Sequence, residues 1–361
     1  MKWSPSVSLV GFLLSSGPTY SLGFVPTGRS VTLSSLKVEK PSPVFSQLRS
    51  PNSSQKSSTA INVVSPEVLA SFLPPAMGFL KTEWTVSYGY GFSTAISALS
   101  LLLKQPLQFS ITTVHAAALV FYGFRLNAFL YLRNRLSPRY REISEKIDDK
   151  AQEKYPSRIS RAPFVLSCGL IFYGLYLPVK LTSDAIALKA ATNLGLTAIK
   201  VLVGLQWFGY FIAALGDLTK SYVKSSERNG KFLVTTGIFS ILRHPNFSGE
   251  ILSWTCNSLC GALSAAYLLR RKFSLSTLAY LGLSTMGWAS MVFVLLRATT
   301  NLEERQRKDY GDTEKYKEWV KNTWSGWKLS PGENTGKTEN VDAMYSITMD
   351  AETEEDFGSG I

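Results

Sequence analysis

Six apolar runs, each close to the length of a bilayer crossing, constrain this chain more than any other feature of its sequence. They cover roughly 85–103, 107–132, 162–179, 194–215, 247–269 and 276–296. A helix that crosses a membrane needs about 20 predominantly apolar residues. The sequence therefore predicts an all-α fold, a polytopic membrane bundle of about six transmembrane helices.

Composition supports apolar spans joined by polar segments. Hydrophobic residues make up 45% of the chain and charged residues only 18%. This balance is too apolar for an average soluble domain and too polar for a chain that lies in lipid throughout. A further apolar stretch, 72–80, contains Pro74 and Pro75 and is expected at the membrane interface rather than across it.

The N-terminal end has the pattern of targeting segments. Residues 1–23 carry Lys2 and a short apolar stretch, as a secretory signal peptide does, and residues 24–66 are rich in serine, basic and poor in acids, as a transit peptide is. The motif Leu22-Gly-Phe-Val-Pro26 between them resembles the two-part plastid presequence of diatoms and related algae. This resemblance implies a plastid membrane. An ordinary signal peptide with a disordered linker, which would leave the protein in the endoplasmic reticulum membrane, is the alternative.

The C-terminal segment 331–361 is acidic and lacks apolar periodicity. It carries eight acidic residues against Lys337. Such a composition predicts a disordered tail without chemistry of its own. The membrane domain is therefore expected within residues 67–330.

The net charge of +12 comes mainly from loops between the apolar runs. Segment 133–161 holds nine Lys/Arg, 218–246 holds five, and 297–328 holds eight. All three fall on one side of a six-span arrangement, which the positive-inside rule assigns to the cytoplasm or stroma. A basic cluster at 270–272 opposes this orientation. Because the basic residues follow membrane topology, the sequence predicts a lipid bilayer as partner and no nucleic acid.

One of these charged segments, 237–250, crowds polar side chains against the fifth apolar run. Arg243, His244, Asn246 and Glu250 lie within eight positions. Ionisable groups are costly in a membrane helix and therefore indicate a site. Arg243 offers a rigid fork of donors to a phosphate, and a helix that begins at the intervening proline would direct its positive end at an anion. Membrane anchoring and helix capping would explain Arg243 alone, but not Glu250 inside an apolar run.

The rest of the chain limits the choice of chemistry. It contains neither GxGxxG nor GxxxxGK[ST], so any nucleotide must be held by the bundle and its loops. Three cysteines without CxxC spacing predict no disulfide framework and no metal site. His115, alone in the middle of a span, is expected to pack and to hydrogen-bond to a neighbouring helix.

Four motifs in order resemble the steroid 5-alpha-reductase-like membrane proteins of the DUF1295 type, over about 88–328. They are the segment 236–254 around Arg243-His-Pro-Asn246, Tyr122-Gly-Phe-Arg-Leu126, Gly216-Asp217 and the segment 303–319. The chain departs from the family at Phe247, where the family usually has Tyr. The resemblance implies the same helical membrane fold.

The resemblance implies NADPH as cofactor and hydride transfer to a polarised carbon–carbon double bond of a lipophilic small molecule, steroid-, isoprenoid- or fatty-enone-like. The residues implied in cofactor binding belong to these motifs: Asp217, Arg243, His244, Asn246, Glu250, Arg305 and Tyr310.

A protein acid must polarise the substrate carbonyl or supply the proton. The sequence does not single it out, and Tyr122 and Glu304 are the catalytic candidates. Tyr122 stands near the end of a span beside Arg125, where packing is the other explanation. Glu304 and its neighbour Glu303 could pair with Arg243 or Arg125 in a buried network, whereas a solvated interfacial helix would explain most of 303–319.

Two other functions stay open. Membrane methyltransferases of lipids or prenylated substrates share the Arg-His-Pro turn and would bind S-adenosylmethionine there. Glu250 favours the reductase, because the methyltransferase motif generally lacks that residue. A non-catalytic membrane scaffold is the third possibility, and the charges of the motif argue against it.

Overall fold

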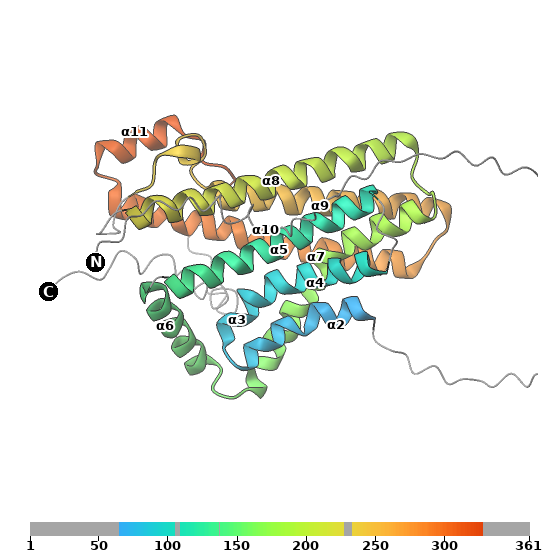
Figure 1. Ribbon diagram of the computed structural model, residues 1–361, viewed down its shortest axis with the longest axis horizontal. Coiled ribbons are helices and arrows are strands. Elements are labelled where there is room, and N and C mark those ends of the chain that lie inside the picture. Colours follow the sequence, from blue (N-terminus) through green and yellow to red (C-terminus); the bar gives the residue numbers. More distant parts are fainter. Residues whose placement is uncertain (1–64, 105–108, 137, 227–232, 328–361) are drawn as a thin grey trace, which may run out of the picture. The chain divides into compact units, whose positions relative to one another are not determined.

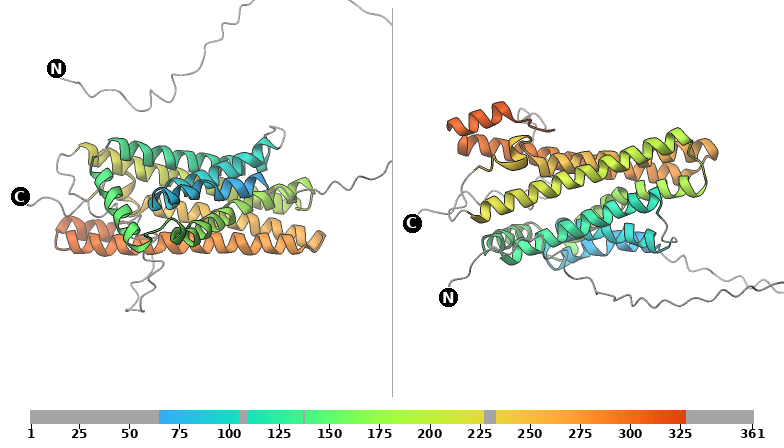
Figure 2. Two further views of the ribbon diagram at one scale, coloured as in Figure 1. Left: turned by 90° about the horizontal axis from the view of Figure 1, so that it is seen from below. Right: turned by 45° about the horizontal axis from the view of Figure 1, so that its top comes forward.

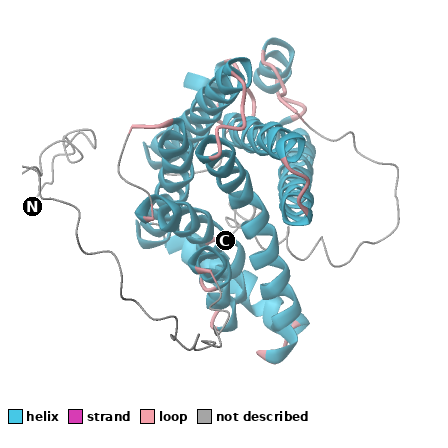
Figure 3. Ribbon diagram, turned by 90° about the vertical axis from the view of Figure 1, so that its right-hand side faces the viewer, coloured by secondary structure: helices cyan, strands magenta, loops and turns pink. Residues whose placement is uncertain are grey.

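The computed structural model describes residues 65–104, 109–136, 138–226 and 233–327 (Figure 1). The signal peptide, nearly all of the transit-like segment and the acidic tail predicted above lie outside these residues. Within the described part, the chain folds into helices and loops with a single isolated bridge (Figure 3). The predicted all-α bundle is confirmed.

The helices follow one another in a simple up-and-down order. The bundle begins with α2 (Pro66–Phe72), η1 (Pro74–Phe79), α3 (Thr82–Val86) and α4 (Tyr88–Leu103). It continues with α5 (Ile111–Leu136), α6 (Pro138–Lys154), η2 (Ile159–Arg161), α7 (Ala162–Ala187) and α8 (Asn193–Ser226). The last elements are η3 (Gly237–Ser240), α9 (Pro245–Arg271), α10 (Leu275–Tyr310) and α11 (Glu314–Asn322).

Five helical segments are long and apolar enough to cross a membrane. They are Thr82–Leu103, Ile111–Leu136, Ile159–Ala187, Asn193–Val223 and Leu275–Tyr310, and they fit an integral membrane protein. The sixth expected span forms α9, which is 27 residues long but more polar. Because α9 packs among α7, α8 and α10, its polar side chains face protein rather than lipid. The six expected helices therefore divide into five apolar ones and this central one.

Several boundaries differ from the prediction, and α8 and α10 continue past the expected 215 and 296 to Ser226 and Tyr310. Helix α7 continues through Pro178 and past 179 to Ala187, where Lys180 pairs with Asp184 one turn further on, at 2.8 Å. The basic segment 133–161 contains a helix, α6, rather than only a loop. The single helix expected over 303–319 is two, because α10 ends before Gly311 and the Thr313 hydroxyl caps α11 by accepting from the Tyr316 amide.

Glycines let two pairs of helices pack closely. A Cβ added to Gly249 of α9 would lie 2.4 Å from the carbonyl oxygen of Gly209 on α8. A Cβ added to Gly123 of α5 would lie 2.1 Å from the carbonyl oxygen of Gly91 on α4. Small residues at such crossings are how membrane helices gain close van der Waals contact. The bundle thus contains an α4–α5 pair and an α8–α9 pair.

Large aromatic rings fill the space between these two pairs, here called the seam. Tyr90 of α4, Tyr122 of α5, Tyr210 of α8 and Trp254 of α9 have ring centroids 4.5–6.0 Å from their neighbours in the group. All four are buried. In Figure 2 the α8–α9 pair and the α4–α5 pair run alongside each other over most of their length.

The charged segments gather at one end of the bundle. In Figure 1, α5, α8 and α10 finish at the end where α6 and α11 lie and where α9 begins. This arrangement confirms that the three basic segments share one face, here called the charged end. Which compartment that face meets stays a prediction.

Candidate functional site

The polar centre of the seam is a contact between α5 and α9. The Tyr122 hydroxyl donates to Oε2 of Glu250 at 2.8 Å, and its oxygen lies 2.9 Å from the Tyr90 hydroxyl oxygen. Tyr122 is 0% exposed. A carboxylate that faces apolar helices needs such a donor to offset its desolvation. The contact therefore holds a carboxylate and a phenolic proton together inside the bundle.

Aromatic packing fixes the orientation of that phenol. The Tyr122 ring stacks on Tyr210 at a centroid distance of 4.5 Å and meets Trp254 edge-on at 5.4 Å. Offset stacking and edge-to-face contacts are the preferred geometries of aromatic pairs. Tyr122 thus has little freedom to leave Glu250 unless a group in the seam replaces that contact.

An ion pair lies next to this centre, towards the charged end. Arg125, almost one turn after Tyr122, pairs with Asp217 of α8. The Arg125 guanidinium carbon is 5.6 Å from the centroid of the Tyr122 ring. Its Nε and Nη2 are buried without a hydrogen-bond partner, although Arg normally uses all its donors. Arg125 therefore has donors left for a ligand.

The first turn of α9 completes this group. Helix α9 begins at Pro245, as the sequence predicts, and the half-buried Asn246 follows it. A Cβ added to Gly216 would lie 2.9 Å from the Asn246 backbone nitrogen. Gly216 therefore lets α8 approach the start of α9, which brings Asp217 and Asn246 to one level of the bundle.

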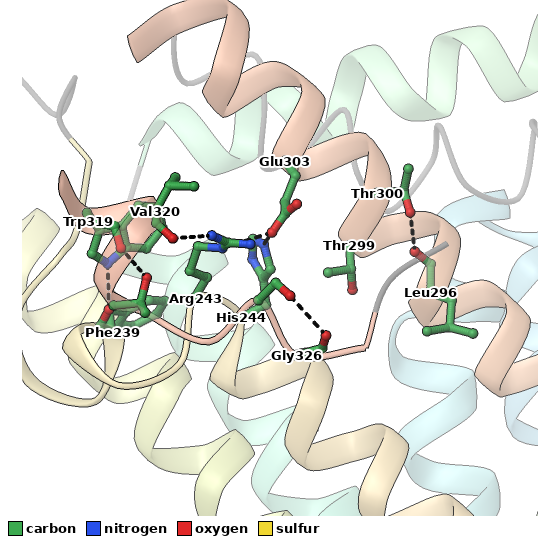
Figure 4. Close-up of polar contacts among 12 residues, drawn as sticks. Phe239, Arg243, His244, Leu296, Thr299, Thr300, Glu303, Trp319, Val320 and Gly326 are labelled. Atoms are coloured by element: carbon green, nitrogen blue, oxygen red, sulfur yellow. Dashed lines mark hydrogen bonds and ion pairs between the residues drawn. The ribbon is translucent and has the colours of Figure 1, made fainter. Parts of the chain in front are cut away.

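A second polar group, here called the latch, consists of Arg243, His244, Glu303 and Val320 (Figure 4). Arg243 Nε donates to Oε1 of Glu303 at 3.0 Å, and Arg243 Nη1 donates to the Val320 carbonyl at 2.9 Å. His244 Nε2 lies 3.2 Å from the same Glu303 oxygen. The latch therefore joins the start of α9 to α10 and to α11. The pairing of Glu303 with Arg243 that the sequence suggested is present.

Backbone contacts strengthen the latch. The Arg243 amide donates to the Trp324 carbonyl at 2.9 Å, and Leu242 and Trp324 form a parallel bridge. The Trp319 indole donates to the Phe239 carbonyl at 2.6 Å. Because two of its side-chain donors are engaged here, Arg243 has a clear structural role in seating the C-terminal segment.

His244 is the titratable partner within the latch. Burial lowers the pKa of its imidazole from the ordinary value of 6.5, and the Glu303 carboxylate beside it opposes that shift. Arg243 and Lys220 lower the pKa further. The imidazole is therefore neutral at pH 7.

The other predicted residues lie on the last turns of α10. Glu304 is exposed, whereas Glu303 at the preceding position makes the contacts of the latch. Arg305 and Tyr310 are half-buried, and the Tyr310 carbonyl accepts from the Thr313 amide where the helix ends. The structure thus brings Tyr122 to Glu250 and pairs Asp217 with Arg125, while Arg243 and His244 form a separate group with Glu303.

Sequence reasoning missed the aromatic members of the seam, Tyr90, Tyr210 and Trp254. A signal was present, because polar side chains recur at helical spacing within the apolar runs. His115 and Tyr122 are seven apart on α5, and Gln206, Tyr210 and Asp217 share one face of α8.

The donors and acceptors towards the charged end of the seam fit a dinucleotide. The Asn246 amide can pair with an amide or a ribose, Asp217 and Glu250 can accept from hydroxyls, and Arg125 has buried donors without partners. Helix α9, which carries Asn246 in its first turn, begins at the end of the bundle that also carries the basic segments.

A profile of the family described as "Protein of unknown function (DUF1295)" matches residues 78–323. No curated protein and no solved structure matches the chain.

Proposed function

The chain belongs to the DUF1295 family, and from that premise we propose that it is an integral membrane reductase. It would use NADPH to reduce a polarised carbon–carbon double bond in a lipid-soluble substrate. Since the family is described as one of unknown function, the proposal rests on the site. The observation that carries it is the buried hydrogen bond between Tyr122 and Glu250.

The cofactor side of the proposal uses the seam towards the charged end. Asn246 and Glu250 of α9 and Asp217 and Arg125 would hold NADPH, which supplies a hydride when bound. The four side chains come from three helices that meet at the glycine-lined start of α9. Arg243 and His244 would support this site by fixing where α9 begins.

Tyr122 is the best-placed acid for the substrate side. A phenol that turns from Glu250 towards a substrate carbonyl would stabilise the negative charge that develops on the carbonyl oxygen during reduction. Glu250 keeps the proton on the phenol until then, because a carboxylate is an acceptor for it. Arg125 beside the Tyr122 ring favours that negative charge. Glu304, being exposed, is less well placed to act on a lipophilic substrate.

Ligand stabilisation of the full-length protein in detergent tests the proposal. NADPH should raise the melting temperature and S-adenosylmethionine should not, since a ligand that binds the folded state stabilises it. The reverse result would replace the reductase with a methyltransferase, and no response to either would favour a scaffold. Asn246→Ala should weaken the NADPH response without unfolding the bundle, and an unchanged response would remove Asn246 from the site.

For location we propose a plastid membrane, reached through the two-part presequence pattern in residues 1–66. A fluorescent protein fused after residue 66 should enter the plastid. Retention in the endoplasmic reticulum would support the alternative reading of the same segment.

A further inference from the structure

A second polar group of the seam lies deeper in the bundle than Tyr122 and has no part in the mechanism above. His115 Nε2 lies 2.8 Å from Oδ1 of Asn257, and Asn257 Nδ2 donates to the Leu175 carbonyl at 2.8 Å. His115 is 0% exposed and Asn257 is 1% exposed. Helices α5, α9 and α7 are therefore joined by a short relay of hydrogen bonds inside the membrane domain.

The relay determines which nitrogen of His115 carries the proton. The Leu175 carbonyl can only accept, so the Asn257 amide nitrogen faces it and the amide oxygen faces His115. Nε2 must then be the donor, and the other nitrogen, Nδ1, is a bare acceptor. Nδ1 is buried and has no hydrogen-bond partner. A buried acceptor without a donor costs free energy, which a ligand hydroxyl would recover.

Gln206 of α8 lies at about the same level of the bundle as His115. Trp207, its neighbour, donates from the indole nitrogen to the carbonyl of Val114, which precedes His115. Gln206 is 0% exposed, and neither atom of its amide makes a hydrogen bond of normal geometry. Helices α5 and α8 thus place the unpaired Nδ1 of His115 and the buried amide of Gln206 at about one level of the bundle.

The distance to the proposed reaction centre follows from helix geometry. His115 and Tyr122 lie seven residues apart on one face of α5, which corresponds to about 10 Å along the axis. The rings of Tyr210 and Trp254 pack against Tyr122 at the upper of the two levels. A molecule that displaced some of these rings could reach both levels at once.

We infer that the deep end of the seam is a binding site for a hydroxyl group. This inference rests on the proposed function and defines its substrate class: a lipophilic molecule whose reducible bond lies about 10 Å from a free hydroxyl. The hydroxyl donates to Nδ1 of His115, and the buried Gln206 amide lies at about the same level on the neighbouring helix. A buried hydrogen bond discriminates strongly between ligands, because an analogue that lacks the hydroxyl leaves the buried acceptor of the protein without a partner.

Three probes of equal length test the inference on the full-length protein in detergent. Each is a linear enone that carries, about 10 Å from the enone carbonyl, an alcohol, a ketone or a methylene. The alcohol should bind about tenfold more tightly than the other two, as one buried hydrogen bond allows. Equal binding of the alcohol and the ketone would overturn the inference, because only the alcohol can donate.

Two variants test whether the preference for the alcohol probe arises at His115. In His115→Gln the terminal amide can keep the bond to Asn257 but the Nδ1 acceptor is lost, so the preference for the alcohol should disappear while the melting temperature changes little. Ser284→Ala removes a buried hydroxyl without a partner on α10, outside the seam, and the preference should remain in this variant. A preference that survives His115→Gln would contradict the assignment. NADPH binding is measured separately: its absence would refute the reductase, and a persisting alcohol preference would still support the His115 site.

Discussion

The Tyr122 hydroxyl of α5 donates a 2.8 Å hydrogen bond to the Glu250 carboxylate of α9, although the two residues are 128 positions apart in the chain. Glu250 belongs to the motif that singles out the start of α9, whereas Tyr122 stands alone in another span. Their contact connects the polar motif at the charged end to the aromatic interior of the bundle. It is the geometry from which the reductase proposal follows.

Replacing Tyr122 with Phe should separate catalysis from packing. The ring contacts with Tyr210 and Trp254 would stay, so we expect a loss of about 2 kcal/mol in the free energy of unfolding, as for other hydrogen bonds to charged groups. Reduction of a lipophilic enone, followed by NADPH oxidation, should fall by about 100-fold or more because the acid is gone. Tyr176→Phe, which removes a buried hydroxyl without a partner on α7, serves as the control. Equal losses in both variants would assign Tyr122 to packing.

The latch predicts that replacing Glu303 or its neighbour Glu304 has very different effects on how firmly the C-terminal segment is held. Glu303→Gln weakens the contacts with Arg243 and His244. Because hydrogen bonds to charged groups contribute about 2 kcal/mol, we expect the free energy of opening of the segment 314–327 to fall by that amount. Hydrogen exchange of that segment measures the effect. Glu304→Gln changes an exposed side chain and should leave exchange as in the wild type. Similar exchange in the two variants would mean that the latch does not hold the C-terminal segment.

The latch should also loosen in mild acid. The pKa of His244 is lower in the folded protein than its ordinary value of 6.5, so the unfolded state binds more protons and stability rises with pH. The contribution is complete above about pH 6.5 and is lost as the pH falls from there through the folded pKa. Trypsin cleavage after Lys321, divided by the rate for an unstructured reference peptide at the same pH, should therefore quicken as the pH falls from 7 to 5.

A second variant attributes that pH dependence to the imidazole. Glu303, Arg243 and Lys220 surround His244 and are the other charged groups that could contribute. His244→Gln removes the titrating ring and keeps a hydrogen-bonding side chain, so its cleavage rate should vary less over the same range. An unchanged slope would assign the effect to the neighbouring charges.

Replacing two glycines of α8 with alanine, one at a time, should change the stability of the protein in opposite directions. Gly209→Ala places a methyl group 2.5 Å from the Gly249 carbonyl, and we expect overpacking to cost about 2 kcal/mol. In contrast, a Cβ on Gly204 of α8 meets nothing within 4 Å, so Gly204→Ala should stabilise the helix by roughly 0.5–1 kcal/mol. Thermal unfolding in detergent compares the two. A stable Gly209→Ala variant would show that the close α8–α9 crossing is not required.

The sequence determined those features that depend on neighbours along the chain. The length and apolarity of the spans define where helices cross, and Pro245 marks where α9 begins because a proline fits the first turn. The alternation of basic segments placed three of them on one face, as the fold confirms. The prediction overestimated the apolarity of α9, because a helix in the centre of the bundle can carry polar groups that face protein.

The tertiary structure alone decided which polar groups meet. Tyr122 with Glu250, Arg125 with Asp217 and Arg243 with Glu303 are 128, 92 and 60 positions apart. Hydropathy specifies that a segment crosses the bilayer but not how the helix is rotated or how far it slides along its neighbours. Rotation and register are set by the glycine crossings and the aromatic rings of the seam, which are contacts between distant segments. For that reason the motif was visible in the sequence, while its division into a seam and a latch required the fold.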